Sequence, residues 1–269
     1  MEKKFIGLGV AAGCVGGIAS FAVARTQVTP LIAAAIDYED GRSAAEAALS
    51  GEREHGHEVF SRALQANVGA GVATVVFGIV LGALFAVAFS VLWARLRRRH
   101  PAVSPRTLAT ALAGAGFVVL YLVPFLGYPA NPPGVGDAAT IGGRTSAYLI
   151  LVVLSVGLAI TAYAAAGRLL PKFGGFTTAV LGAAGYVLAI SLVLLAMPTY
   201  AETPGPLADS QGAELYPGFP AEVLADFRLY SVLASAVMWT VIGATFAAFV
   251  PRVLANRPST AGLATVATT

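Results

Sequence analysis

The chain has 269 residues, of which 57% are hydrophobic and only 12% are charged. Soluble domains carry about 25% charged residues, so this composition excludes an ordinary soluble protein and predicts one that lipid partly covers. The net charge of +3 does not indicate nucleic-acid binding, because the basic residues flank apolar segments, where they meet anionic headgroups. A single cysteine excludes a disulfide framework and a multi-cysteine metal site.

Six apolar segments are each long enough to cross roughly 30 Å of hydrocarbon as a helix. They cover residues 5–24, 68–93, 107–126, 147–166, 176–197 and 229–249. Each segment is apolar on all sides rather than along one stripe, as expected of helices that face lipid. The sequence therefore predicts an all-α integral membrane protein, with a bundle of six transmembrane helices within residues 1–256 and a disordered tail at 257–269.

The charges between these segments alternate in sign along the chain. The first, third, fifth and last flanks hold 11 of the 17 basic residues and one of the 14 acidic residues, a net charge of +10. The other connections hold the remaining six basic and 13 acidic residues, a net charge of −7. Because membrane proteins retain lysine and arginine on the cytoplasmic side, the pattern predicts that both termini are cytoplasmic.

The first apolar segment allows two interpretations. Its basic start and the A-x-A motif at 22–24 match a cleavable signal peptide. Gly9, Gly13 and Gly17, spaced four residues apart, instead form a small-residue face that suits helix packing in a retained span. We favour the retained helix, which gives six crossings.

Two outer connections carry further signals of local structure. Ser43 and Glu46 match a capping box, which predicts that a short helix begins at Ser43. Residues 198–228 are acidic and contain five prolines, which favour an extended backbone.

A cluster of histidines and carboxylates precedes the second apolar segment. Imidazole and carboxylate together suit divalent first-row metals. On a helix, Glu54 and Glu58 share one face, whereas His55 and His57 point apart and could bind one ion only if the glycine between them lets the backbone extend. These four residues are candidate metal ligands, and the alternative is a solvated charged turn.

The most distinctive string of the chain is Tyr128–Asp137, with the sequence YPANPPGVGD. Its prolines stiffen the backbone and its glycines permit close approach. A rigid, irregular segment at a membrane boundary needs partners for its carbonyl groups, and protein, water or a cation can supply them. Asn131 and Asp137 add side-chain oxygens and are candidate ion ligands. The alternative is a structural turn in which Asp137 pairs with Arg144.

The apolar segments contain no Asp, Glu, Lys, Arg or His well inside their bounds. Such residues usually mark ion pathways, so a pore here would have to use backbone carbonyls or polar side chains. The chain also lacks a Walker-type loop, an HExxH motif and a nucleophile–base pair. We therefore expect neither an enzyme nor a permanently bound cofactor.

The stretch from Val123 to Asp137, followed by TIGGRT at Thr140–Thr145, closely resembles the CbtA family of predicted cobalt transporter subunits, which are bacterial membrane proteins. The likeness extends to the glycine-rich second segment and to Gly218–Pro220, and it covers nearly the whole chain. The resemblance implies cobalt uptake across the inner membrane, linked to cobalamin synthesis, often with a small histidine-bearing partner, CbtB. Many members carry a longer histidine-rich outer loop, whereas this chain has two histidines there, so a partner would supply the missing imidazoles.

Two functions remain open from the sequence. In the first, the chain is the membrane subunit of an uptake transporter for cobalt or another divalent cation, which the acidic outer face concentrates. In the second, it is a non-transporting scaffold or regulatory subunit of a transport complex. The small-residue faces and the lack of polar residues inside the spans favour this alternative.

Overall fold

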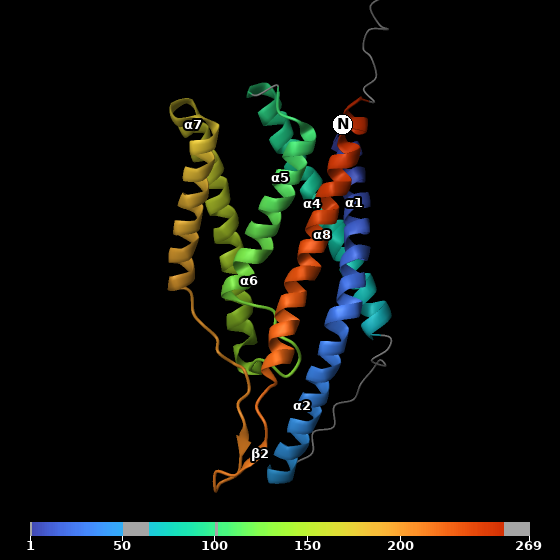
Figure 1. Ribbon diagram of the computed structural model, residues 1–269, viewed down its shortest axis with the longest axis vertical. Coiled ribbons are helices and arrows are strands. Elements are labelled where there is room, and N and C mark those ends of the chain that lie inside the picture. The colour runs from blue at the N-terminus through green and yellow to red at the C-terminus, as the bar shows by residue number, and fades with distance from the viewer. Residues whose placement is uncertain (1, 51–64, 100–101, 256–269) are drawn as a thin grey trace, which may run out of the picture. The chain divides into compact units, whose positions relative to one another are not determined.

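The computed structural model describes residues 2–50, 65–99 and 102–255 (Figure 1). Within this part of the chain, five helical stretches are long and apolar enough to cross a membrane: 2–50, 66–98, 105–127, 138–196 and 221–255. Large apolar side chains are exposed along them, and Phe176 and Leu195 are each 84% exposed. The predicted helical membrane fold is confirmed in this form, while the count of six crossings and the side of the termini remain predictions.

The first stretch runs without interruption through α1 (Glu2–Val23), a π-helical turn η1 (Ala24–Val28) and α2 (Thr29–Ser50). The expectation that a short helix begins at Ser43 is wrong, because Ser43 lies in the middle of α2. Pro30 has no backbone N–H and crowds the preceding turn of an α-helix. The wider turn directly before it absorbs this mismatch, so the helix continues instead of restarting.

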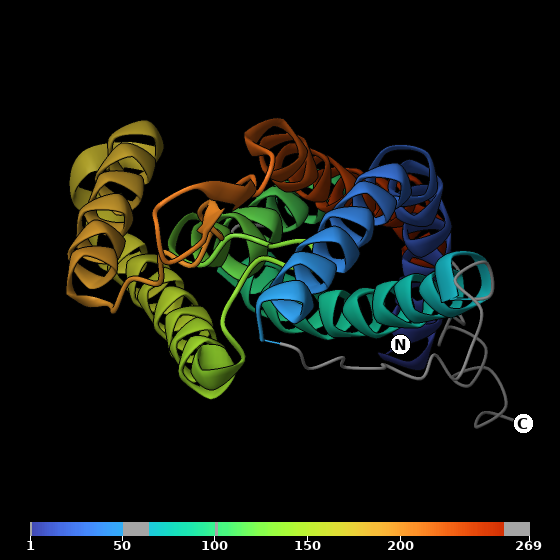
Figure 2. The same cartoon turned by 90° about the horizontal axis from the view of Figure 1, so that it is seen from below.

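The fourth stretch, α7 (Ile141–Ala196), contains two of the predicted segments, 147–166 and 176–197. Its backbone leaves helical geometry at Gly174, with φ 73° and ψ 172°, a conformation that glycine adopts without strain. There the chain reverses, and the two limbs lie side by side in both views (Figures 1 and 2). Buried Leu151 of one limb and Ile190 of the other share a core with Val123.

The remaining elements of the described residues are four helices, three short helical turns and two strands. After η2 (Gln65–Gly69) comes α4, and α5 is followed by a π-helical turn, α6 and a 3₁₀ turn. Their bounds are α4 (Ala70–Arg99), α5 (Pro105–Phe117), η3 (Val118–Leu122), α6 (Val123–Gly127), η4 (Ala138–Thr140), β1 (Leu207–Ala208), β2 (Glu214–Tyr216) and α8 (Ala221–Ala255). The strands form an antiparallel pair. The extended backbone expected over 198–228 is wrong from Ala221 onward, where Glu222 complements the amino-terminal dipole of α8.

The chain divides into two compact units. The first comprises Met1–Phe21, Gly69–Ala115 and Val237–Thr269, and the second comprises Ala22–Val68 and Gly116–Ala236.

In the first unit, α1 and α4 meet backbone to backbone. A Cβ atom built on Gly82 would lie 2.8 Å from Gly13 Cα, and one on Gly78 would lie 2.9 Å from Gly17 Cα. Only glycine permits such proximity, and this close packing of small residues drives helix association in lipid. The predicted small-residue face of α1 is confirmed as a packing face.

An aromatic cluster closes one end of the same unit. The Phe246 ring is fully buried, with its centroid 4.8 Å from that of Phe89 and 5.1 Å from that of Phe85. Phe5 joins them, 5.6 Å from Phe89 in an edge-to-face arrangement. Helices α1, α4 and α8 are thereby fixed to one another by side chains as well as by glycine contacts.

In the second unit, α2 packs against the segment that carries the strand pair. Tyr38 lies 4.9 Å from Phe219 and 5.5 Å from Tyr216 between ring centroids, and its hydroxyl donates to the carbonyl of Pro217 at 3.1 Å. Ala35 and Val135 are buried in the same cluster. Through Val135 this core holds the proline-rich segment in place.

Candidate functional site

The predicted metal ligands divide into two groups. Glu54, His55, His57 and Glu58 lie outside the described residues. Asn131 and Asp137 lie in the second unit, on the irregular segment between α6 and η4. The described part of the chain contains no group of three or more His, Cys, Asp or Glu side chains that could hold a metal ion.

Part of the irregular segment is held by its own backbone and by α2. Val135 N–H donates to the Pro132 carbonyl at 3.3 Å. Gly134 and Gly136 have φ of 73° and 127°, values that glycine tolerates best. A Cβ on Gly134 would lie 3.4 Å from Glu39 Cβ, so the segment passes close over α2. This arrangement agrees with the structural turn considered from the sequence.

The side chain of Asp137 begins the helical turn that follows it. Its Oδ1 accepts the N–H of Ala139 at 2.8 Å and so caps η4. The expected ion pair between Asp137 and Arg144 is wrong. Arg144 Nη2 donates instead to the backbone carbonyl of Asp137 at 3.2 Å.

The carboxylate that Arg144 meets is Glu202, which follows α7 and which the sequence analysis did not single out. Arg144 Nε and Glu202 Oε2 are 3.3 Å apart. Glu202 also accepts the Thr140 hydroxyl at 2.5 Å and the Asp137 N–H at 2.9 Å. The Thr140 hydrogen bond, the Asp137 N–H and the Arg144 charge hold the pKa of Glu202 below its usual 4.5. Glu202 thus links the segment that follows α7 to Thr140 and Arg144 at the start of α7.

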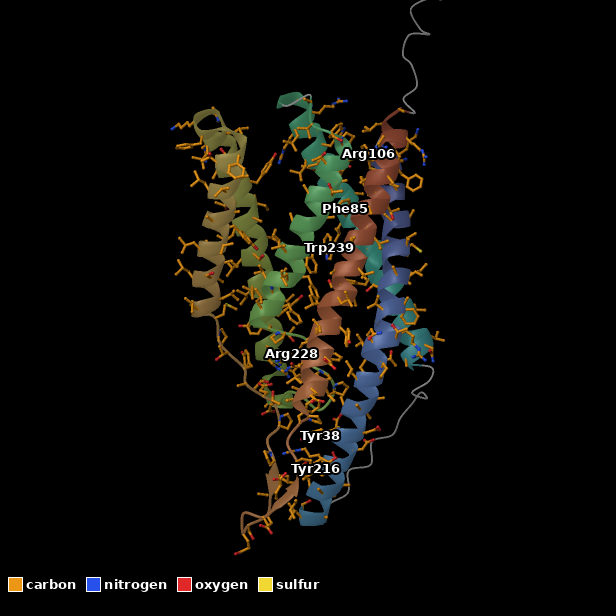
Figure 3. All side chains as sticks on the ribbon, viewed as in Figure 1. Tyr38, Phe85, Arg106, Tyr216, Arg228 and Trp239 are labelled. Atoms are coloured by element: carbon orange, nitrogen blue, oxygen red, sulfur yellow. The ribbon has the colours of Figure 1, made fainter. Side chains whose placement is uncertain are left out.

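A cavity of about 380 Å³ lies beside these contacts, within the second unit. Its polar lining includes Asn131, Arg144 and Arg228, together with the phenol groups described below. Asn131 Oδ1 accepts a hydrogen bond from Arg228 Nη2 at 2.8 Å. Figure 3 shows Arg228 on the first turns of α8. The amide oxygen predicted as an ion ligand is therefore bound by a guanidinium group.

Three tyrosines also line the cavity: Tyr128, Tyr148 and Tyr200. Tyr128 donates its hydroxyl to the Pro198 carbonyl at 2.8 Å, and its ring lies 6.1 Å from that of Tyr200. The sequence offered one signal for this site, because Arg228 is the basic residue that directly precedes the last apolar segment. Tyr128 begins the distinctive string itself, whereas Glu202, Tyr148 and Tyr200 carried no signal in the sequence.

A buried polar contact also links the two limbs of α7. Ser155 Oγ lies 2.7 Å from the Val119 carbonyl and 2.7 Å from the Tyr186 hydroxyl, and Ser155 is fully buried. One hydroxyl can donate to the carbonyl while it accepts from the other hydroxyl. The contact satisfies its own groups, so it is a structural feature of the helix pair.

A protein-family model described as a probable cobalt transporter subunit, CbtA, matches residues 2–251. No curated protein and no solved structure matches the chain. The matched range includes the five membrane-length helices almost completely, as well as the proline-rich segment and the cavity. The chain therefore belongs to the CbtA family of probable cobalt transporter subunits.

Proposed function

We propose that this chain is the membrane-spanning subunit of a cobalt uptake transporter in the bacterial inner membrane. The observation that carries the proposal is the sorting of charge between the apolar segments, with a net charge of −7 on one set of connections and +10 on the other. The family gives cobalt as the substrate. An acidic outer face raises the local concentration of a divalent cation and so speeds its capture from that side.

Six crossings follow if the two limbs of α7 are counted separately. Each limb contains one of the predicted segments, and the chain reverses at Gly174. Arg168 and Lys172 lie directly before this reversal. Basic residues favour the cytoplasmic side, which supports an inner position for the turn and for both termini.

The capture step is assigned to Glu54, His55, His57 and Glu58, where imidazole and carboxylate ligands suit cobalt. Asn131 and Asp137 then act at the entrance to the bundle. Both need a change for this role: Arg228 must leave the Asn131 oxygen, and Asp137 must release the Ala139 N–H. A small histidine-bearing partner of the CbtB kind would supply further imidazole ligands.

Uptake of radioactive cobalt by cells that express the chain, alone and with a candidate small subunit, tests the proposal. The His55→Ala/His57→Ala double variant is expected to lower uptake. His100→Ala is the matched control, because the third histidine follows the second apolar segment, on the basic side of the chain. Uptake equal to that of empty cells in the presence of the partner would contradict the proposal.

A scaffold or regulatory role is the second candidate. It is favoured by the engagement of Asn131 with Arg228 and by the glycine contacts between α1 and α4, which serve packing alone. This role predicts that Asn131→Ala and the double histidine variant leave cobalt uptake unchanged, while removal of the whole chain abolishes it by destabilising a partner. Measuring the partner's abundance in membranes of the deletion strain separates the two candidates.

A further inference from the structure

We propose that the cavity beside the proline-rich segment binds an oxyanion, and that a phosphate group is the chemistry its donors fit. The cavity lies inside one compact unit, and its volume of about 380 Å³ is at the small end of the range found for ligand pockets. The inference concerns the cavity alone and does not depend on how cobalt crosses the membrane.

Arg228 is the first observation. One of its donors binds Asn131, while its Nε is buried and has no hydrogen-bond partner among the residues that the structure describes. No carboxylate within the described ranges lies at ion-pair distance from it. A buried donor of a charged group is costly to leave unpaired. A guanidinium in this state is a ready partner for an anion.

Arg144 provides the second guanidinium of the lining. Its Nε is likewise buried without a hydrogen bond in the described part of the chain, although Glu202 neutralises part of its charge at 3.3 Å. A Cβ on Gly136 would lie 2.6 Å from Arg144 Nη1, so this glycine lets the guanidinium approach the segment closely. Two guanidinium groups and no acidic side chain are among the residues that line the cavity, which favours an anion there.

The neutral lining selects among anions. Tyr148, Tyr200 and Thr145 offer hydroxyl groups around the same space. The paired N–H donors of an arginine guanidinium group match the geometry of phosphate and carboxylate groups. A carboxylate has two oxygens, whereas a phosphate presents three or four acceptors that several donors can engage together. The number and spread of donors therefore favour phosphate.

Phosphate can come from two sources in a membrane protein, as a free ion or as the headgroup of a lipid. Both present the same oxygens to the arginines. The experiment therefore uses full-length protein in nanodiscs of phosphatidylcholine alone, or of phosphatidylcholine mixed with phosphatidylglycerol. Binding of radioactive inorganic phosphate is measured in each at matched ionic strength, and bound phosphatidylglycerol is counted by native mass spectrometry.

Arg228→Gln is the test variant, and Arg25→Gln is the matched control. Arg25 Nε also donates to an asparagine oxygen, that of Asn67 at 2.7 Å, and Arg25 is not part of the cavity lining. We expect Arg228→Gln to weaken binding of the phosphate source by about tenfold to a hundredfold, as for loss of a charge-assisted hydrogen bond. Arg25→Gln should bind like the wild type.

The two nanodisc compositions distinguish the sources. Saturable binding of inorganic phosphate in both points to the free ion. If phosphatidylglycerol stays bound to the wild type but not to Arg228→Gln, the ligand is a lipid headgroup. Equal binding by wild type and Arg228→Gln in every arm, or equal losses in Arg228→Gln and Arg25→Gln, would overturn the proposal. Where the glutamine variant fails to fold, the wild type decides: absence of saturable phosphate binding and of retained phosphatidylglycerol in every nanodisc would overturn the proposal.

Discussion

Substituting Gly82 by alanine is expected to destabilise the first unit. The added Cβ would lie 2.8 Å from Gly13 Cα and 2.9 Å from Gly13 N, and ordinary contact begins at 3.4 Å. Both neighbours are backbone atoms, so α1 and α4 must move apart by more than half an ångström. Overpacking of this kind costs about 1–3 kcal/mol. Alanine recovers up to about 1 kcal/mol through its higher helix propensity, which leaves a net loss.

Gly114→Ala in α5 is the matched control, because nothing lies within 4 Å of a Cβ at that position. The control should be neutral or more stable by up to about 1 kcal/mol. The assay is equilibrium unfolding of the purified protein in mixed micelles by sodium dodecyl sulfate, followed by circular dichroism. If Gly82→Ala proved as stable as Gly114→Ala, the close backbone contact between α1 and α4 would be refuted.

Three further changes test other parts of the structure. Phe246→Ala removes the centre of the aromatic cluster and should cost about 3–5 kcal/mol in the same assay; a loss below 1 kcal/mol would contradict that core. Ser155→Ala leaves the Tyr186 hydroxyl and the Val119 carbonyl without their partner, and we expect stability to fall by about 1–3 kcal/mol. Ser146→Ala is the control and should be neutral, because the Ser146 hydroxyl bonds only to its own helix. Glu202→Gln should lower thermal stability at pH 7, because a carboxyl group whose folded pKa is depressed contributes stability above its unfolded pKa. That difference should shrink as pH falls below about 4.5 through the folded pKa, and a difference independent of pH would show that the Glu202 charge contributes nothing.

The apolar segments predicted the helices well because hydrophobic length alone decides whether a helix can cross a bilayer. The same signal says nothing about how the helices connect. The helix through Thr29 continues because a π-helical turn absorbs Pro30, and no periodicity reports such a turn. The sequence suggests two separate helices here, and the backbone does leave helical geometry between them, at Gly174.

The candidate site was predictable only in part. The proline-rich string indicated a segment that lines the cavity, because its composition demands a fixed irregular backbone. The partners of that segment could not be predicted, since Glu202 and Arg228 are far from Asn131 in sequence and arrive through the packing of α7 and α8. The cation site at Asn131 and Asp137 stays a prediction, and the sequence did not show that nearby donors bind the same oxygens.

The tight reversal at Gly174 has a consequence for how this part of the protein meets its surroundings. Phe173 is 51% exposed and Phe176 is 84% exposed, and they flank the turn together with Lys172. The basic side chain favours the headgroup layer of a membrane, and the exposed phenylalanine rings favour the adjoining hydrocarbon. Because the turn uses no loop, it offers little extended backbone to a protease or an antibody. The turn should therefore lie at the lipid–water boundary and fix the depth at which both limbs of α7 cross the membrane.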